Sequence, residues 1–71
     1  MNIIKVGQIY LDLDIRSYND RQIRIDQIST DGLSVRISAR YGISPFESRK
    51  RTIKIARLQN LRFFKFITTE V

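Results

Sequence analysis

Apolar and polar residues alternate with a period of two along two adjoining stretches of the chain, residues 22–28 and 33–40. This period is typical of β-strands with one buried face, and residues 30–32 between the stretches include a glycine suited to a tight turn. The pattern therefore predicts a β-hairpin. Asp26 and Gln27 interrupt the alternation and predict a bulge in the first strand. In the second strand, the expected core residues are Leu33, Val35, Ile37 and Ala39, and the expected solvent-facing residues are Ser34, Arg36, Ser38 and Arg40.

Shorter pieces of the same alternation predict three further strands. They cover residues 8–13, 52–56 and 62–68. Ile9, Leu11 and Leu13 share one face of the first of these, and Tyr10, Asp12 and Asp14 share the other. The expected inward residues of the other two are Ile53, Ile55, Phe64 and Phe66, whereas Phe63, Lys65 and Ile67 are expected on the opposite face of the last strand.

The connections between these strands have their own patterns. Residues 16–20 are polar and predict a turn, and residues 41–51, which contain a glycine and a proline, predict a long loop. Leu58 and Leu61 lie three residues apart, which is the spacing of a single 3₁₀ turn over residues 57–61.

Five short strands, a long loop before the fourth and a 3₁₀ turn before the fifth describe a small, strongly bent antiparallel barrel of the all-β class. This layout resembles that of SH3-like barrels over most of the chain. An OB-like barrel is the main alternative, although that fold usually has a longer chain and a helix between its third and fourth strands. No repeat, low-complexity tract or linker interrupts the sequence, so residues 1–71 are predicted to form one domain.

Cysteine and histidine are absent from the 71 residues, which removes most small-enzyme chemistry. No P-loop or dinucleotide-binding glycine pattern follows Gly7, so no cofactor is predicted. We therefore expect a binding module and not an enzyme. No apolar run approaches the about 20 residues that span a bilayer, and the first residues lack the order of a secretory signal. These features predict a soluble cytoplasmic protein with no membrane partner.

The net charge of +6 is unevenly distributed along the chain. Residues 1–35 hold four Lys and Arg residues and five Asp residues, whereas residues 36–71 hold nine Lys and Arg residues and two Glu residues. A basic half beside a nearly neutral one indicates a face that meets an anionic partner, of which nucleic acid, DNA or RNA, is the commonest. The alternative is a generic basic surface that keeps the protein soluble.

The predicted loop over residues 41–51 is the strongest candidate site. Arg49, Lys50 and Arg51 can neutralise adjacent phosphates, and the rings of Tyr41 and Phe46 offer faces for unpaired bases. The alternative is that the two rings plug and rim one end of the barrel while the cations are merely solvated.

The solvent faces of the predicted strands add further cations, which would form a stripe continuous with the loop if the barrel closes. They are Arg36, Arg40, Lys54 and Lys65, with Arg24 on the neighbouring strand. Because no recognition helix is available for a major groove, contacts are expected mainly to the nucleic-acid backbone, with strong salt dependence.

Asp12 and Asp14, with Asp20 nearby, are the only clustered carboxylates of the sequence. Paired carboxylates can hold magnesium or act as acid and base, but the spacing does not fit an EF-hand. Arginines follow closely, at Arg16 and Arg21 among others, so we expect solvated carboxylates paired with arginines and no metal site.

The opening Lys5-Val6-Gly7-Gln8-Ile9-Tyr10, followed by Asp12, Asp14, Arg16 and residues 21–25, is similar to short proteins of bacteria and their phages that share a Lys-x-Gly-Gln-apolar-aromatic start. The resemblance covers about the first third of the chain and implies a phage or mobile-element origin. It also favours an alternative function, a protein-interaction module such as a phage-encoded inhibitor of a host defence protein or enzyme.

The last predicted strand bears on this alternative because both of its faces carry apolar side chains. Exposed Phe63 and Ile67 would form an apolar patch, or an edge available for a homodimer. A third interpretation is a sponge for small anionic nucleotides held between two protomers.

Overall fold

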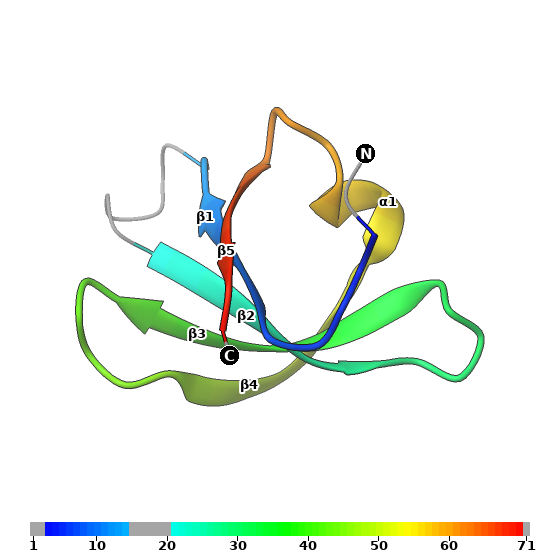
Figure 1. Cartoon of the computed structure of the whole chain (residues 1–71), viewed down its shortest axis with the longest axis horizontal. Coiled ribbons are helices and arrows are strands. Elements are labelled where there is room, and N and C mark those ends of the chain that lie inside the picture. The colour runs from blue at the N-terminus through cyan, green and yellow to red at the C-terminus, as the bar shows by residue number, and fades with distance from the viewer. Residues whose placement is uncertain (1–2, 15–20, 71) are drawn as a thin grey trace.

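The computed structural model describes residues 3–14 and 21–70, apart from the side chain of Lys50. The predicted turn at residues 16–20, with Arg16 and Asp20, lies outside the described residues. Five antiparallel strands form one sheet in the order β4-β3-β2-β1-β5 (Figure 1). The elements are β1 (Gln8–Asp12), β2 (Arg21–Ile28), β3 (Ser34–Tyr41), β4 (Glu47–Lys54), the helical turn α1 (Ile55–Leu58) and β5 (Phe64–Thr69). The all-β class is therefore confirmed.

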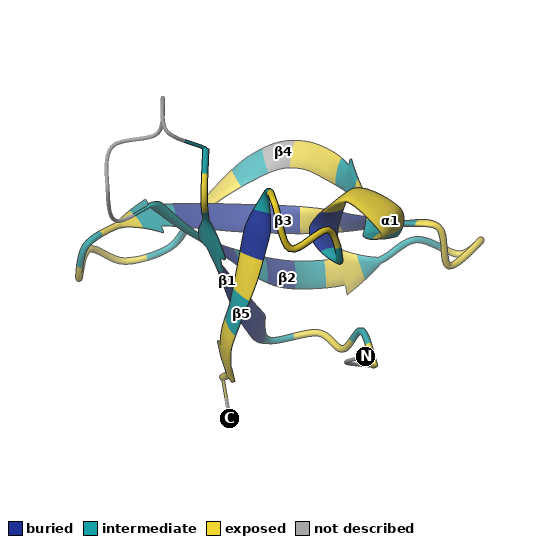
Figure 2. Ribbon diagram, turned by 90° about the horizontal axis from the view of Figure 1, so that it is seen from above, coloured by how far each residue is buried: buried dark blue, intermediate teal, exposed yellow. Residues whose placement is uncertain are grey.

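The sheet bends strongly without closing into a complete barrel. β1 and β5 run steeply across the layer formed by β2, β3 and β4 (Figures 1 and 2). Within the described part of the chain, β4 and β5 are the two edges of the sheet and do not pair with each other. The register shifts in three of the four strand pairs, and such irregularities bend the strands that carry them.

The predicted hairpin is confirmed by the pairing of β2 with β3, in which Ile25 lies opposite Ile37. The predicted bulge is also present, because the register shifts between Ile25 and Gln27. Val35, Ile37 and Ala39 are buried as expected, but Leu33 is 68% exposed. The strand pairing ends where the Ser29 amide donates to the Ser34 carbonyl over 2.9 Å, which leaves Leu33 in the turn outside the sheet.

The predicted loop over residues 41–51 is wrong over its second half. β4 begins at Glu47, so the connection after β3 is short and Arg49, Lys50 and Arg51 lie within a strand. A register shift hides the alternation here. Ser38 pairs with Ser48, but its neighbour Ile37 pairs with Arg51, so β4 has two extra residues between these two pairs. Ile55 was expected in this strand but starts α1.

Ile9 and Tyr10 of β1 are both buried, although the alternation placed them on opposite faces and grouped only Ile9 with the apolar residues. Tyr10 is only 3% exposed, lies opposite Phe66 and meets its ring edge to face at a centroid distance of 5.5 Å. A register shift between Ile9 and Tyr10 accompanies this pairing. Phe64 is buried and Phe66 packs against the core, as predicted, but Phe63 also packs against it.

The core lies in the fold of the sheet and is closed on one side by α1 (Figure 2). Leu58 is the buried residue of that turn. The turn begins two residues before the predicted 3₁₀ turn, and its Gln59 amide donates to the Ile55 carbonyl in α-helical fashion. The next amide, that of Asn60, donates to the Arg57 carbonyl over three residues, as in a 3₁₀ turn. The buried core cluster comprises Tyr10, Ile23, Ile25, Val35, Ile37, Ala39, Leu58 and Phe64.

Among the described residues, no helix is both long enough and apolar enough to pass through a bilayer.

Candidate functional site

The ion pairs of the described residues involve cations of the first half of the chain. Arg21 donates to Asp12 over 2.5 Å, and Arg24 contacts Asp26 at 3.0 Å and Glu70 at 3.3 Å. Burial by itself would lower the pKa of Arg24, but the hydrogen bonds to the two carboxylates outweigh it and raise the pKa. Both guanidinium groups are therefore neutralised locally.

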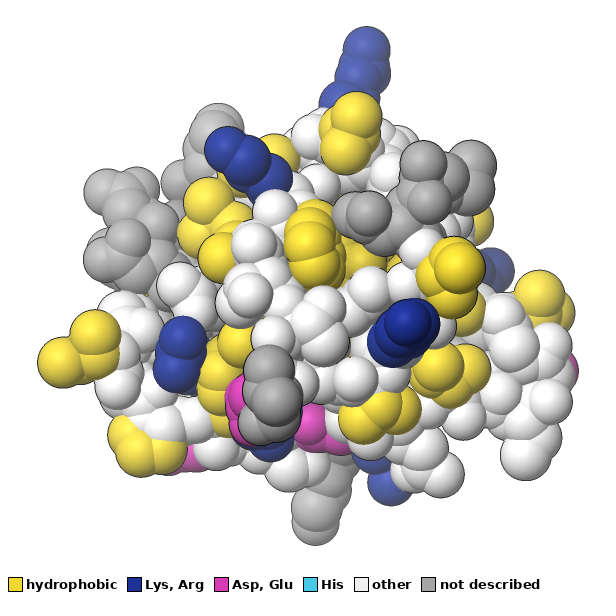
Figure 3. Space-filling view, in the orientation of Figure 1, with side chains coloured by type: hydrophobic (Ala, Val, Ile, Leu, Met, Phe, Trp, Pro, Cys, Tyr) yellow, Lys and Arg dark blue, Asp and Glu magenta, His cyan; other side chains and the backbone are white. Residues whose placement is uncertain are grey.

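The cations of the second half have a different environment. Among the described side chains, no carboxylate lies within ion-pair distance of any of them. In the face seen in Figure 3, Lys and Arg side chains are dispersed across the surface, whereas most of the visible acidic surface lies together in the lower part of the view. The cations concerned are Arg36, Arg40, Arg49, Arg51, Lys54, Arg57, Arg62 and Lys65.

Four of the predicted cations occupy the outer face of the sheet, away from the core. Arg36 lies opposite Thr52, and Lys54 lies opposite Ser34, so the two cations are diagonal neighbours on β3 and β4. Lys65 also faces outward but is paired with Leu11. Two strands, β1 and β2, therefore separate Lys65 from β3. The expected single stripe is thus interrupted.

Phe46 lies among the cations of this outer face. The guanidinium carbon of Arg40 is 4.3 Å from the centroid of its ring and that of Arg24 is 4.8 Å away. Arg40 also donates to the Gln22 side-chain oxygen over 2.9 Å. The ring is half-buried, so it packs on the outside of the sheet and does not plug a barrel end, whereas Tyr41 at the end of β3 is 48% exposed.

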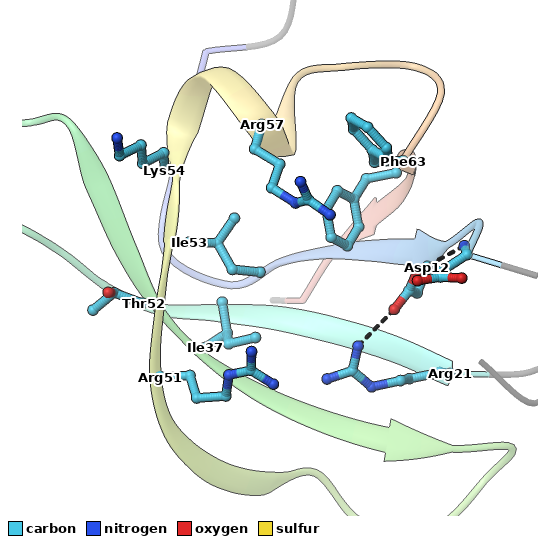
Figure 4. Close-up of a pocket in the computed structure, with 11 residues that line it drawn as sticks. Asp12, Arg21, Ile37, Arg51, Thr52, Ile53, Lys54, Arg57 and Phe63 are labelled. Atoms are coloured by element: carbon cyan, nitrogen blue, oxygen red, sulfur yellow. Dashed lines mark hydrogen bonds and ion pairs between the residues drawn. The ribbon is translucent and has the colours of Figure 1, made fainter. Parts of the chain in front are cut away.

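On the inner side, the space between β4, α1 and the start of β5 forms an open groove of about 670 Å³. Figure 4 shows Arg21, Arg51 and Arg57 reaching into it from three different elements, while Thr52 and Lys54 point away. Four cations and two carboxylates line it, above apolar side chains. The lining residues are Asp12, Asp14, Arg21, Ile37, Arg51, Thr52, Ile53, Lys54, Arg57, Phe63 and Phe64.

Arg51 faces this groove because it lies opposite Ile37 on the inner side of the sheet, two residues before Ile53. The structure thus separates Arg51 from Arg36 and Lys54, which lie on the outer face. Sequence reasoning missed the groove and with it Arg57 and Phe63, whose contact places the guanidinium carbon 4.3 Å from the ring centroid. For Arg51 a signal was present, since extending the alternation backward from Ile53 gives it the inward parity.

The Asp12 and Asp14 carboxylates lie at the end of the groove nearest β1. The Asp12 side chain is 7% exposed, so it is not solvated as expected, and it is paired with Arg21. Its other oxygen accepts the Asp14 backbone amide over 2.9 Å. The expected pairing with an arginine is therefore present for Asp12. The described residues contain no group of three or more acidic, His or Cys side chains that could hold a metal ion.

No protein-family model, curated protein or solved structure matched the chain. The residues themselves provide a cationic surface divided between two faces of one sheet. The outer face carries Arg36, Arg40, Lys54 and Lys65, and the inner groove receives Arg51 and Arg57. Such a surface can bind polyanions by neutralising several charges at once.

Proposed function

We propose that the protein is a non-catalytic nucleic-acid-binding domain. The observation that carries the proposal is the charge distribution, in which second-half cations such as Arg36, Arg51 and Lys54 have no carboxylate partner among the described residues. Cations without a neighbouring carboxylate, on both faces of so small a protein, create a positive potential that attracts phosphates. The absence of catalytic histidine and cysteine from the sequence fits a binding role.

We also infer that the fold is an SH3-like small barrel. What supports this is the strand order, in which β1 lies between β2 and β5, and the helical turn α1 immediately before the last strand. The unpaired edges β4 and β5 leave an opening in such a barrel. That opening is the groove into which the inner cations reach.

The expected mode of binding is contact with the phosphate backbone. The single helical element of the described residues, α1, is four residues long and too short to serve as a recognition helix in a major groove, so base edges are not expected to be read there. Each cation that neutralises a phosphate releases counterions, and affinity should therefore fall steeply with salt. DNA and RNA share this backbone chemistry.

Fluorescence anisotropy with labelled DNA and RNA oligonucleotides tests the proposal. Binding is expected at about 50 mM salt and should weaken severalfold or more at about 200 mM. Replacement of Arg49, Lys50 and Arg51 together by alanine should weaken binding of all sequences by a similar factor. Absence of binding to either nucleic acid at low salt would refute the proposal.

A matched pair of lysine variants distinguishes the effect of the proposed binding surface on affinity from the effect of net charge. Lys54→Gln removes an outer-face cation of the basic half, and Lys5→Gln removes an exposed cation of the first half. Each variant loses one positive charge. Only Lys54→Gln should reduce the slope of log affinity against log salt concentration, by about the amount that one phosphate contact contributes. Equal effects of the two substitutions would argue for non-specific attraction by net charge.

A second candidate function is that of a protein-interaction module, including an inhibitor of a host protein. The observation that favours it lies on β5, an edge strand within the described chain, where Ile67 is 44% exposed. An exposed strand edge with an apolar side chain can pair with another chain, including a second copy. A phage or mobile-element origin stays a prediction from the first third of the sequence.

Light scattering after size-exclusion chromatography tests the homodimer form of this candidate. A dimer that dissociates in the variant Ile67→Lys would support it. A monomer at all concentrations, together with no protein recovered from a host lysate, would count against it. Neither result affects the anisotropy measurement with nucleic acid.

A further inference from the structure

We propose that the groove between β4, α1 and the start of β5 seats a nucleotide of a single strand, so that the protein prefers single-stranded to double-stranded nucleic acid. This inference rests on the proposed nucleic-acid binding and adds its ligand class and site. It assigns roles to Arg51, Arg57 and Phe63. The two arginines and the aromatic ring come from three different parts of the chain (Figure 4).

The size of the groove suits such an occupant. Its volume of about 670 Å³ lies within the range of about 300–1,000 Å³ that is typical of small-molecule sites. The groove is open to one side, because the edge strands β4 and β5 do not pair within the described residues. A nucleotide can therefore enter while its neighbours along the strand stay outside.

The charges in the groove favour an anion. Three guanidinium groups reach into the groove, those of Arg21, Arg51 and Arg57, against two carboxylates in its lining, so cations are in excess. Arg21 is neutralised by one of these carboxylates, that of Asp12, at 2.5 Å. Arg51 and Arg57 have no carboxylate within ion-pair distance among the described side chains. Two guanidinium groups that reach into one space repel each other, and a phosphate between them relieves that repulsion and accepts their hydrogen bonds.

The same groove offers a surface for a base. Arg57 lies over the Phe63 ring, with 4.3 Å between its guanidinium carbon and the ring centroid. A planar guanidinium supported on an aromatic ring is a stacking platform for a base. The apolar side chains of Ile37 and Ile53 form the floor beside it. A phosphate site and a stacking surface thus adjoin in one groove, which is the combination that single-strand binding proteins use.

A duplex cannot use this combination. Its bases are paired and stacked, so a base face becomes available only after the costly extrusion of a nucleotide. A duplex can still bind the cations of the outer face, such as Arg36 on β3, through its phosphates. The two kinds of nucleic acid should therefore respond differently to substitutions in the groove.

The test compares single strands and duplexes of the same length in anisotropy titrations, with DNA and RNA in separate arms. The intact protein should bind the single strand about tenfold or more tightly than the duplex at matched salt. Phe63→Leu keeps the site apolar but removes the ring, and it should reduce that preference by about tenfold. Circular dichroism and thermal unfolding show whether the variant keeps its fold.

A pair of arginine variants provides the charge-matched comparison. Arg51→Gln removes a groove cation, and Arg36→Gln removes an outer-face cation from the neighbouring strand. Arg51→Gln should weaken single-strand binding more than duplex binding, whereas Arg36→Gln should weaken both equally. A preference for single strands that survives both Phe63→Leu and Arg51→Gln would overturn the groove assignment.

Photocrosslinking of the unmodified protein avoids any dependence on how the variants fold. A single strand that carries 5-iodouracil should crosslink to residues of the groove, with Phe63 as the main site. Crosslinks confined to the outer face would overturn the inference but leave the proposed nucleic-acid binding intact. An acidic peptide could instead displace the strand by binding more tightly through the same groove residues. That result would also overturn the inference, in favour of a protein ligand.

Discussion

At the scale of single residues, Gly7 joins both ends of the described chain to the sheet. Its amide donates to the Ile25 carbonyl over 2.8 Å, and its carbonyl accepts the Glu70 amide over 2.7 Å. Its φ of +93° lies in the left-handed region that side chains disfavour. A Cβ at this position would lie 3.0 Å from the Glu70 carbonyl oxygen. Glycine is therefore required here by both conformation and space.

We predict that Gly7→Ala lowers the free energy of unfolding by about 1–3 kcal/mol. Gly32→Ala is the matched control, because Gly32 also has a positive φ, of +72°, but no atom within 4 Å of the added Cβ. Gly32→Ala introduces the backbone strain without the close contact, so it should lower the free energy of unfolding by less than Gly7→Ala does. Urea titrations followed by circular dichroism measure both values. Equal losses would show that the contact with Glu70 contributes nothing.

Asp31 organises the turn of the β2–β3 hairpin. The Ser29 hydroxyl donates to its carboxylate over 2.5 Å and the Leu33 amide donates to the same oxygen over 2.9 Å. These hydrogen bonds hold the pKa of Asp31 below its ordinary value of 3.8, and the one from Ser29 has the largest effect. Because the pKa of Asp31 is lower in the folded state, its ionised carboxylate stabilises the folded protein fully at pH values above the ordinary pKa of 3.8. This stabilisation is lost as the pH falls from there through the lowered pKa of the folded state.

The variant Asp31→Asn should therefore unfold with less dependence on pH than the unmodified protein below 3.8. An asparagine oxygen can still accept the hydrogen bonds of the turn, but it does not titrate. Thermal unfolding at a series of pH values from neutral downward measures the difference. Parallel curves for the two proteins over the acid range would contradict this role of Asp31.

At the scale of elements, the helical turn α1 and the residues after it show how similar side chains differ in their contribution. Leu58 is 1% exposed in the core, whereas Leu61, at the next turn of the chain, is 83% exposed. The spacing of the two leucines predicted a single 3₁₀ turn over residues 57–61. Only Leu58 packs inward, because the chain turns away at Asn60, whose carbonyl accepts the Phe63 amide over 2.9 Å.

We predict that Leu58→Ala lowers the free energy of unfolding by about 2–5 kcal/mol, since it leaves a cavity in the core. Leu61→Ala changes the same atoms on the surface and should alter it by no more than about 0.5 kcal/mol. Chemical unfolding of the two variants side by side measures the difference. A large loss in Leu61→Ala would mean that this residue is covered in solution, as by a second copy.

At the scale of the whole molecule, the ion pairs of the described residues all involve cations from the first half of the chain. Arg21 and Arg24 are paired with carboxylates, whereas the described cations of the second half have no ion-pair partner among the residues that the structure describes. Like charges brought together by folding repel one another, and dissolved salt screens that repulsion over about 10 Å at 0.1 M. The charge that serves binding therefore reduces the stability of the free protein.

The unmodified protein should consequently become more stable when salt is raised from about 50 mM to about 500 mM. The double variant Arg36→Gln/Lys54→Gln removes two neighbouring outer-face cations and should show a smaller salt effect. Unfolding in urea, which is uncharged, allows the salt concentration to be varied independently. A loss of stability with added salt would indicate that ion pairs outweigh the repulsion.

Much of the fold could be predicted from local pattern. The β2–β3 hairpin, its bulge after Ile25 and the inward parity of Phe64 followed from alternation that one buried face imposes. The start of β4 could not be predicted, because residues 47–51 are polar on both faces of an edge strand. The inward position of Tyr10 was equally hidden, since a register shift beside it decides which residues face the core.

The sequence by itself determined the all-β class, the absence of histidine and cysteine chemistry and the concentration of charge in the second half. These are properties of composition and of neighbours along the chain, which do not depend on distant contacts. Only the tertiary structure decided that Arg51 and Arg57 reach from β4 and α1 into one open groove while Arg36 lies on the outer face. That division depends on which strands pair and which edges stay apart, and such contacts join residues far separated in sequence.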